Sequence, residues 1–406
     1  MNEGKAMPMT FGGRPFRPFD ADNHYYETID AFTRHLDRRF RRRGVQVVKA
    51  NDRPMILIGE KVNRFIPNPT FDPVLVPGAL DPYFRGEIPE GVDPESLRVV
   101  EPIHAEYRDR DARADRVGAQ GLGLVLLFPT LGCGVEEALR DDVPATMASL
   151  AAFNRWLEDD WGYHYRERLF AAPMLSLADP PAALAELDRV LGLGARVVCV
   201  RPAPVPGADG RPRSLGDPAH DPFWARLAEA GVPVAFHLAD SGYNLLAAAW
   251  GGPARYDPFH LDPMTKLVIS DRAIHDAIGS LIVDGVFGRF PGLRVMSIEN
   301  GAAWVPLLVR RLKKLANQQP KHFASDPGDV LREHVWVAPY FEEDVMELAG
   351  WIGAERVLFG SDWPHGEGLA EPTDFVERLG GFGDADVRRI MRDNLAECLG
   401  MPADER

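Results

Sequence analysis

The segment LFAAPMLSLADPPAALAELDRVLGLGARVVCVRP, residues 169–202, contains one complete strand–helix–strand pattern. Its two ends, 169–177 and 195–202, are short apolar runs without period-two alternation, which is typical of strands covered on both faces. Between them, apolar residues recur at helical spacing over 180–194; we expect this helix to begin after Asp179 as its N-cap and to end at a glycine. The segment therefore predicts two parallel strands joined by a helix.

The same alternation recurs along most of the chain. Further buried strands are expected at 14–22, 123–130, 232–238, 293–300, 334–340 and 356–362. Helical patterns lie at 140–158, 221–231, 302–317, 342–352 and 384–399. About eight such strand–helix units predict an α/β fold in the form of a (β/α)8 TIM barrel, with a doubly wound open sheet as the alternative.

Two segments do not follow the alternation. We interpret residues 1–406 as a single TIM-barrel domain with a long insertion, 41–118, after strand 1 and a helical excursion, 241–290, after strand 5. A short helix is expected at about 27–40, and the insertion begins with a predicted β-hairpin around Asn51–Asp52–Arg53–Pro54. Such an arm or lid would cover the pocket of its own or a neighbouring subunit, so we expect a homo-oligomer, most simply a homodimer.

Composition excludes several classes of partner. The chain is 45% hydrophobic, as in ordinary globular proteins, and its net charge is −14 from 46 basic and 60 acidic residues. An acidic protein does not supply the basic field that nucleic acids or anionic membranes require. No apolar run approaches the ~18 residues of a membrane span. Three cysteines (Cys133, Cys199, Cys398) make no disulfide framework, which together with an N-terminus lacking an apolar leader predicts a cytoplasmic protein.

Polar residues at the predicted strand ends form a candidate metal site, because barrel active sites lie at the carboxyl ends of the strands. Asp22 and His24 end strand 1 and project from the same face, while His237 ends strand 5 and Asp362 ends strand 8. Two imidazoles and two carboxylates make a mixed donor set for one divalent ion, Zn²⁺ or Mn²⁺, with Fe²⁺ possible. Each residue alone has a structural alternative, a hydrogen-bonded histidine or an N-cap aspartate; their conjunction favours the metal.

Each of the other candidate site residues also has an alternative, structural role. Arg201, at the end of strand 4, would clamp a substrate carboxylate, or else make an ion pair at that strand end. His275, in the excursion, would enter the pocket as a catalytic group, or else be a core or interface histidine. Glu27, His365 and Tyr340 are candidates for contacts with the metal ligands or with the substrate. The alternatives are an acid in the first turn of a helix for Glu27 and core packing for Tyr340. We expect His365 to orient the loop of Asp362.

Four phrases carry a resemblance to a known family: FDADNHYYE (19–27), VPVAFHL (232–238), GVFGRFPGLRVMSIENGAAWVP (285–306) and RVLFGSDWPHGEG (356–368). With these the chain resembles the metal-dependent amidohydrolase superfamily, in the branch containing aminocarboxymuconate-semialdehyde decarboxylase and γ-resorcylate decarboxylase. The resemblance implies one divalent metal in a TIM barrel, bound from strands 1, 5 and 8.

The chain departs from the family pattern at two positions. Asp22 replaces the first histidine of the usual Asp-x-His-x-His motif; the γ-resorcylate type has glutamate there, and a carboxylate favours harder ions such as Mn²⁺. Glu299 stands where related decarboxylases have a histidine at strand 6. Next to a metal it would act as a general base or acid, as a further ligand, or as a partner of a ligand.

Three functions remain open from the sequence. The first is non-oxidative decarboxylation of a small carboxylic acid, with Glu299 or Asp362 protonating the carbon that loses CO₂. The second is hydrolysis or hydration by metal-activated water acting on an amide, lactone or C–C bond, with Asp362 taking the proton and Glu299 assisting. The third is a non-catalytic binding barrel stabilised by its metal.

Overall fold

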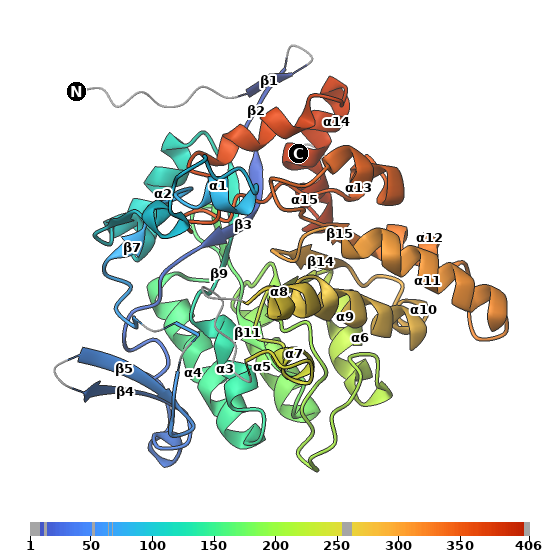
Figure 1. The fold of residues 1–406 in the computed structure, drawn as a ribbon. Helices are drawn as coiled ribbons and strands as arrows, with labels where there is room; N and C mark the ends of the chain where they lie inside the picture. The colour runs from blue at the N-terminus through green and yellow to red at the C-terminus, as the bar shows by residue number, and fades with distance from the viewer. Residues whose placement is uncertain are drawn as a thin grey trace.

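Parallel strands form the centre of the computed structural model, which describes residues 9–11, 14–50, 53–63, 65–66, 68–253 and 262–401 (Figure 1). Three of the strands are hydrogen-bonded in the order β10 (Leu169–Ala171), β9 (Leu124–Phe128), β3 (Phe19–His24). Five more follow the order β11 (Met174–Leu175), β12 (Val198–Val200), β13 (Val234–His237), β14 (Val295–Ile298), β15 (Val335–Val337). Every neighbouring pair in both groups is parallel, so the predicted α/β architecture is confirmed.

Backbone hydrogen bonds connect the two groups of strands. β10 and β11 are separated by two residues, and the amide of Ala172 donates to the Leu127 carbonyl at 3.0 Å. At the opposite edges of the two groups, the amide of Leu358 donates to the Val337 carbonyl at 2.9 Å, and the amide of Ala21 donates to the Phe359 carbonyl at 2.8 Å. The segment 357–363 therefore lies between β15 and β3.

This segment is not a regular strand, which differs from the expectation for 356–362. Its pairing is limited to single bridges, Val337 with Val357 and Asn23 with Trp363. The amide of Phe359 donates instead to the Ile390 carbonyl, and the backbone of Asp362 is left-handed, with φ of 56°. Both features interrupt a regular ladder although the segment keeps its place in the order of strands.

Helices follow the strands as the apolar spacing predicted. α5 (Pro180–Gly192) begins where the Asp179 side chain accepts a hydrogen bond from the Ala182 amide, and α6 (Asp221–Ala230) ends at Gly231 in the left-handed conformation. Further helices outside the excursion are α2 (Arg110–Ala119), α4 (Val143–Asp160), α11 (Trp304–Gln318), α12 (Pro327–His334) and α13 (Val345–Ile352). The C-terminal helical stretch runs from α14 (Asp384–Arg388) through a π-helical turn, Arg389–Asp393, into α15 (Asn394–Cys398).

The prediction of a short helix at about 27–40 is wrong. Residues 29–35 form turns and bends, and only Arg38–Phe40 is helical, as a single 3₁₀ turn. The Asp30 side chain accepts hydrogen bonds from Thr28 and Arg34, and Asp37 accepts one from the Arg39 amide. Short side-chain acceptors of this kind compete with helical backbone pairing and favour turns.

Residues 41–118 contain small antiparallel sheets and short helices. β4 (Val45–Ala50) pairs with β5 (Arg53–Ile58), which agrees with the predicted hairpin, although Asn51 and Asp52 lie outside the described residues. β5 pairs with β6 (Lys61–Val62), and β7 (Val74–Leu75) pairs with β8 (Val100–Glu101). The single helical turn α1 (Asp81–Phe84) lies between them. In Figure 1 the β4–β5 pair extends away from the central strands.

The excursion after β13 consists of α7 (Asn244–Ala248), α8 (Pro263–Ile269), α9 (Arg272–Val283) and α10 (Val286–Arg289). Within the described residues, no helix is both long and apolar enough to cross a lipid bilayer.

Both faces of the central strands are buried. On β9, Leu124, Leu126 and Phe128 join a core cluster with Met296 and Trp336, from other strands, whereas Val125 and Leu127 join the larger cluster shared with the helices. Successive side chains of a strand point to opposite faces, so strands between two cores need apolar residues at every position. This explains the absence of alternation in the sequence.

Candidate metal centre

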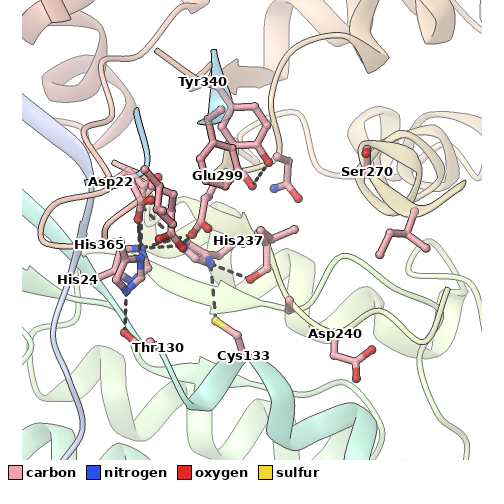
Figure 2. Close-up of a pocket in the computed structure, with 18 of the residues that line it drawn as sticks. Asp22, His24, Thr130, Cys133, His237, Asp240, Ser270, Glu299, Tyr340 and His365 are labelled. Carbon is pink, nitrogen blue, oxygen red and sulfur yellow. Dashed lines mark hydrogen bonds and ion pairs between the residues drawn. The ribbon is translucent and has the colours of Figure 1, made fainter. Parts of the chain in front are cut away.

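Four polar side chains from three strand ends converge in one cavity (Figure 2). Asp22 and His24 come from β3, His237 is the last residue of β13, and Glu299 directly follows β14. Each offers one nitrogen or oxygen atom, and the four atoms lie within 4.8 Å of one another. We call these four residues the metal cluster.

His24 lies at the centre of this arrangement. Its Nε2 atom is 3.2 Å from Asp22 Oδ1, 3.4 Å from Glu299 Oε2 and 3.3 Å from the Nε2 atom of His237. The side chain is only 1% exposed. One ring nitrogen of a buried histidine therefore faces two carboxylates and a second imidazole at once.

His237 has its orientation set by the backbone. Its Nδ1 atom is 2.9 Å from the Leu238 carbonyl, which accepts a proton and donates none, so Nδ1 carries the hydrogen. The neutral ring then presents the lone pair of Nε2 toward Glu299 Oε2 at 3.0 Å and Asp22 Oδ1 at 3.5 Å. A lone pair directed at two carboxylate oxygens is unfavourable, so a cation, either a metal ion or a proton on Nε2, must lie between them.

The residues present fit one divalent metal ion. Asp22 Oδ1 is buried and makes no hydrogen bond, although an isolated ionised carboxylate is costly to bury. Two imidazole nitrogens and two carboxylate oxygens are suitable ligands for Zn²⁺, Mn²⁺ or Fe²⁺. The cluster thus has the donor types, the spacing and the uncompensated oxygen expected of a metal site.

Asp362 lies directly beside the cluster. Its Oδ1 atom is 3.2 Å from His24 Nε2 and 2.7 Å from His365 Nδ1. His365 in turn places its Nε2 atom 3.0 Å from the Thr130 hydroxyl and stacks on the His24 ring at 4.0 Å. Asp362, His365, His24 and Glu299 form a second group that satisfies metal-ligand spacing. Asp362 is therefore placed either to bind the ion or to exchange a proton with His365.

The two carboxylates that follow strand ends share an uncommon backbone conformation. Glu299 has φ of 55° and Asp362 has φ of 56°, in the left-handed region that non-glycine residues seldom adopt. Such conformations persist where surrounding structure imposes them, and they are found preferentially at functional sites. Here the Tyr340 hydroxyl donates to the Glu299 carbonyl at 3.0 Å, and the Asp362 amide donates to the Asp22 carbonyl at 2.9 Å.

The surroundings of these two carboxyl groups shift their pKa values in opposite directions. Burial opposes the charge on Glu299, but His237, followed by His24, holds the pKa of its carboxyl well below the usual range. Burial raises the pKa of Asp362 well above the usual carboxyl range, and the negative charge of Glu299 raises it further. Pairs of carboxyls with pKa values driven apart are typical of sites that need one base and one acid.

Other predicted residues lie farther from the cavity. Glu27 is fully buried, and its carboxylate accepts hydrogen bonds from the amides of Thr130, Leu131 and Gly132 at 3.0–3.1 Å. It therefore shapes the loop after β9, where Thr130 contacts His365. Among the described residues that line the cavity, neither Glu27, Arg201 nor His275 is present.

Arg201 and His275 have partners of their own. The Arg201 guanidinium contacts Glu137 at 2.5 Å and Glu136 at 3.7 Å, and it donates to the Asp240 carbonyl at 3.1 Å. This is the ion pair that the sequence left as the alternative. His275, in α9, contacts Asp276 at 2.8 Å. Their predicted catalytic roles remain untested expectations.

Two contacts near the cluster were missed by sequence reasoning. Cys133 lines the cavity with its Sγ atom 3.7 Å from His237 Nδ1, and nothing in its sequence context distinguishes it from a core cysteine. Asp20 accepts hydrogen bonds from the amide and the hydroxyl of Ser361 at 3.0 and 2.5 Å, so it connects β3 to the segment that carries Asp362. Its place in the Asp20–Asp22–His24 pattern was the available signal.

Comparisons with known proteins find similar sequences and structures. The family described as amidohydrolase matches residues 134–400. A curated γ-resorcylate decarboxylase from Rhodococcus jostii (strain RHA1) is 28% identical over 242 residues, 57% of this chain and 70% of the relative. A solved amidohydrolase from Mycobacterium avium subsp. paratuberculosis K-10 is 57% identical, with a TM-score of 0.91 over 95% of this chain and 99% of the other.

A more distant structure shares the fold. A solved dihydroxybenzoic acid decarboxylase from Polaromonas sp. JS666, which carries manganese and the inhibitor 2-nitroresorcinol, is 17% identical, with a TM-score of 0.60 over 95% of this chain and 97% of the other.

Proposed function

This chain belongs to the amidohydrolase family of metal-dependent enzymes, and we propose that it is a carboxy-lyase that removes CO₂ from a small carboxylic acid. The observation that carries the proposal is the pair Asp362–His365 directly beside the metal cluster, because it places a proton-carrying group next to a site for a carboxylate. The γ-resorcylate decarboxylase from Rhodococcus jostii and the manganese-containing decarboxylase from Polaromonas support the same reaction class.

Asp22, His24, His237 and Glu299 would hold one divalent ion. The sequence assigned the fourth ligand position to Asp362; we propose Glu299 in its place, because its Oε2 atom lies 3.4 Å from His24 Nε2 and 3.0 Å from His237 Nε2, whereas Asp362 Oδ1 lies 2.7 Å from His365. Two carboxylates among the ligands favour a harder ion, which supports Mn²⁺ over Zn²⁺. When bound, the ion supplies positive charge to a substrate carboxylate and a neighbouring oxygen.

The protein's own groups would move the proton. In decarboxylation the bond between the substrate carbon and its carboxylate breaks, CO₂ leaves, and the electron pair stays on the carbon. We propose that the carboxyl of Asp362 delivers a proton to this carbon, and that His365, at 2.7 Å from Asp362 and 3.0 Å from the Thr130 hydroxyl, restores it from the cavity. One proton is consumed for each CO₂ released.

Product analysis tests the reaction type. The Mn²⁺-loaded protein is incubated with aromatic acids bearing an ortho-hydroxyl group, and CO₂ and the decarboxylated product are measured. Stoichiometric CO₂ supports the proposal. Incorporation of oxygen from labelled water without release of CO₂ would overturn it in favour of hydrolysis or hydration. The contact of the Glu299 carboxylate with both histidines is the observation that favours this alternative.

The finer architecture is also proposed. We propose that the two parallel groups and the segment 357–363 form one (β/α)8 barrel over residues 1–406, supported by the hydrogen bonds of Leu358 to Val337 and of Ala21 to Phe359. Residues 41–118 would then be an insertion after strand 1 that acts as an arm or lid, and 241–290 an excursion after strand 5. The lining of the cavity by Phe65, Leu80 and Tyr83 supports the lid role.

The expected homodimer and cytoplasmic location remain proposals. Burial of all three unpaired cysteines supports a reducing compartment. A single monomeric species in sedimentation at all concentrations would refute the dimer.

A further inference from the structure

The cavity extends well beyond the metal cluster. Its volume of about 640 Å³ falls within the range of about 300–1,000 Å³ that encloses drug-sized ligands. The inner end contains the ionisable groups of the cluster and the Asp362–His365 pair. The outer part, which we call the outer chamber, is lined by apolar side chains, among them Phe65, Ile66, Leu80, Tyr83, Phe84 and Ile269, together with charged side chains such as Glu95, Arg98 and Lys266.

One wall of the outer chamber is attached directly to the site. The amide of Leu80 donates to the Gly366 carbonyl at 2.8 Å, and that of Gly78 donates to the His365 carbonyl at 3.3 Å. A Cβ atom on Gly78 would come within 2.8 Å of the Ala370 backbone, so this wall leaves no room for a larger residue there. The segment that carries α1 therefore has a fixed position relative to His365.

Phe65 forms a second fixed contact. Its ring packs against Gly134, where an added Cβ atom would approach the ring to 2.8 Å. Ile66 and Leu80 are almost completely buried, with 6% and 7% exposure. The apolar lining near the site is thus built into the fold before a ligand arrives.

Aromatic side chains continue this lining to the outside. Tyr83 and Phe84 line the chamber and remain 43% and 39% exposed. The Lys266 ammonium, from α8, lies 5.3 Å from the Tyr83 ring and 5.8 Å from the Phe84 ring, so α1 and α8 meet at the opening. Exposed apolar surface that adjoins a cavity is typical of a binding site for an apolar group.

We infer that the substrate carries, in addition to its carboxylate, an apolar extension such as an alkyl chain or a second ring that occupies the outer chamber. This inference rests on the proposed function for the carboxylate end. A single-ring acid bound at the metal cluster would leave the walls formed by Tyr83 and Phe84 in contact with water. An apolar extension would displace that water and bury apolar area on both molecules.

Chain length in the substrate tests the inference. The Mn²⁺-loaded protein is assayed with 2,6-dihydroxybenzoate and its 4-alkyl derivatives of increasing length. We expect KM to fall about fourfold for each methylene group that becomes buried, while kcat changes little, because the chain contributes equally before and during the reaction. A KM that stays constant or rises with chain length would overturn the inference.

A binding measurement separates this inference from the proposed reaction. Resorcinol and 5-hexylresorcinol lack the carboxylate but carry the alkyl chain at the matching ring position, so their affinities, measured by calorimetry on the Mn²⁺-loaded protein, do not depend on turnover. We expect the hexyl compound to bind at least about tenfold more tightly. The double variant Tyr83→Ser, Phe84→Ser should lose most of this preference, whereas Leu307→Ser, at a residue 45% exposed on α11, should keep it.

The outcomes are distinguishable. If the protein prefers alkylated ligands but no acid yields CO₂, the proposed reaction is refuted, whereas binding of an apolar group in the outer chamber is supported. If CO₂ is released but neither KM nor affinity responds to chain length, the inference on the substrate class is refuted. An alkyl preference that survives in the double variant would also refute it, because the chain would then bind elsewhere.

Discussion

Replacement of His237 by alanine tests the metal cluster with a closely matched control, His334. Both histidines are buried, with 2% and 5% exposure, and each places Nδ1 2.9 Å from a backbone carbonyl, of Leu238 and Leu293 respectively. The two alanine variants therefore lose a similar hydrogen bond and a similar buried ring. Only His237 directs its other nitrogen toward Asp22 and Glu299.

The expected magnitudes follow from ligand linkage. Each variant loses about 0.5–1.5 kcal/mol for the hydrogen bond and about 2–5 kcal/mol for the buried side chain, with or without metal. Mn²⁺ at about 100 times its Kd adds about 2.7 kcal/mol to the unfolding free energy of a protein that binds it only when folded. The wild type and His334→Ala should show this increment. Even a hundredfold weaker affinity reduces it to about 0.4 kcal/mol in His237→Ala.

Urea unfolding is followed by tryptophan fluorescence after dialysis against a chelator, with and without added Mn²⁺, and bound metal is measured by elemental analysis. His237→Gln repeats the comparison with less lost volume. An increment in His237→Ala and His237→Gln within about 0.5 kcal/mol of that of the wild type, with metal still bound, would place the ion away from His237 and refute the assignment.

Three further predictions follow from the same contacts. Asp362→Asn should lower kcat by about 10²–10⁴-fold while bound metal stays constant, because the variant lacks the transferable proton; metal loss in this variant would show that Asp362 is a ligand instead. Glu27→Gln should lower the unfolding free energy by about 1–3 kcal/mol in urea, since its amide group cannot accept from all three loop amides that Glu27 now binds; an unchanged midpoint would contradict this. Burial raises the pKa of Glu342 from 4.5 to about 7, so its neutral form favours the folded state and this contribution is lost as pH rises between these values. Glu342→Gln should therefore lose less stability than the wild type between pH 4.5 and 8, by on the order of 2 kcal/mol, and parallel pH profiles would refute the assignment.

The central strands and their terminal residues were accessible from the sequence for a physical reason. Strands between two cores must be apolar at every position, so runs such as 123–130 are recognisable, and the first polar residues after them lie where the strands end. Asp22, His24 and His237 were found in this way. The sequence named Asp362 as the ligand and left the role of Glu299 open, because both follow a strand and only their three-dimensional neighbours differ.

Most of the other differences between the sequence-based predictions and the structure arise from contacts between segments distant in the chain. Arg201 follows β12, and the sequence alone allowed it to bind a substrate carboxylate. Its actual partners Glu136 and Glu137 belong to the short helix α3 (Val135–Ala138), about 65 positions earlier in the chain. The segment 356–362 has the composition of a strand, yet Phe359 donates to Ile390 from the C-terminal helices. In and after the turns at 29–35, Asp30 and Asp37 provide local acceptors that override the weak helical spacing.

The chemistry and the proposed substrate preference reside in different parts of the chain. The ionisable groups come from strand ends and are held by the strands themselves, as Asp20 shows by binding both the amide and the hydroxyl of Ser361. The outer chamber comes from segments outside the strand–helix alternation, around α1 and α8. Gly78 and Leu80 connect the two parts through the backbone of His365 and Gly366. A change in the α1 segment can therefore alter which molecule fits without moving the metal cluster, provided that these two hydrogen bonds are kept. Relatives that share Asp22, His24 and His237 but differ around residues 65–84 should accordingly share a reaction and differ in substrate.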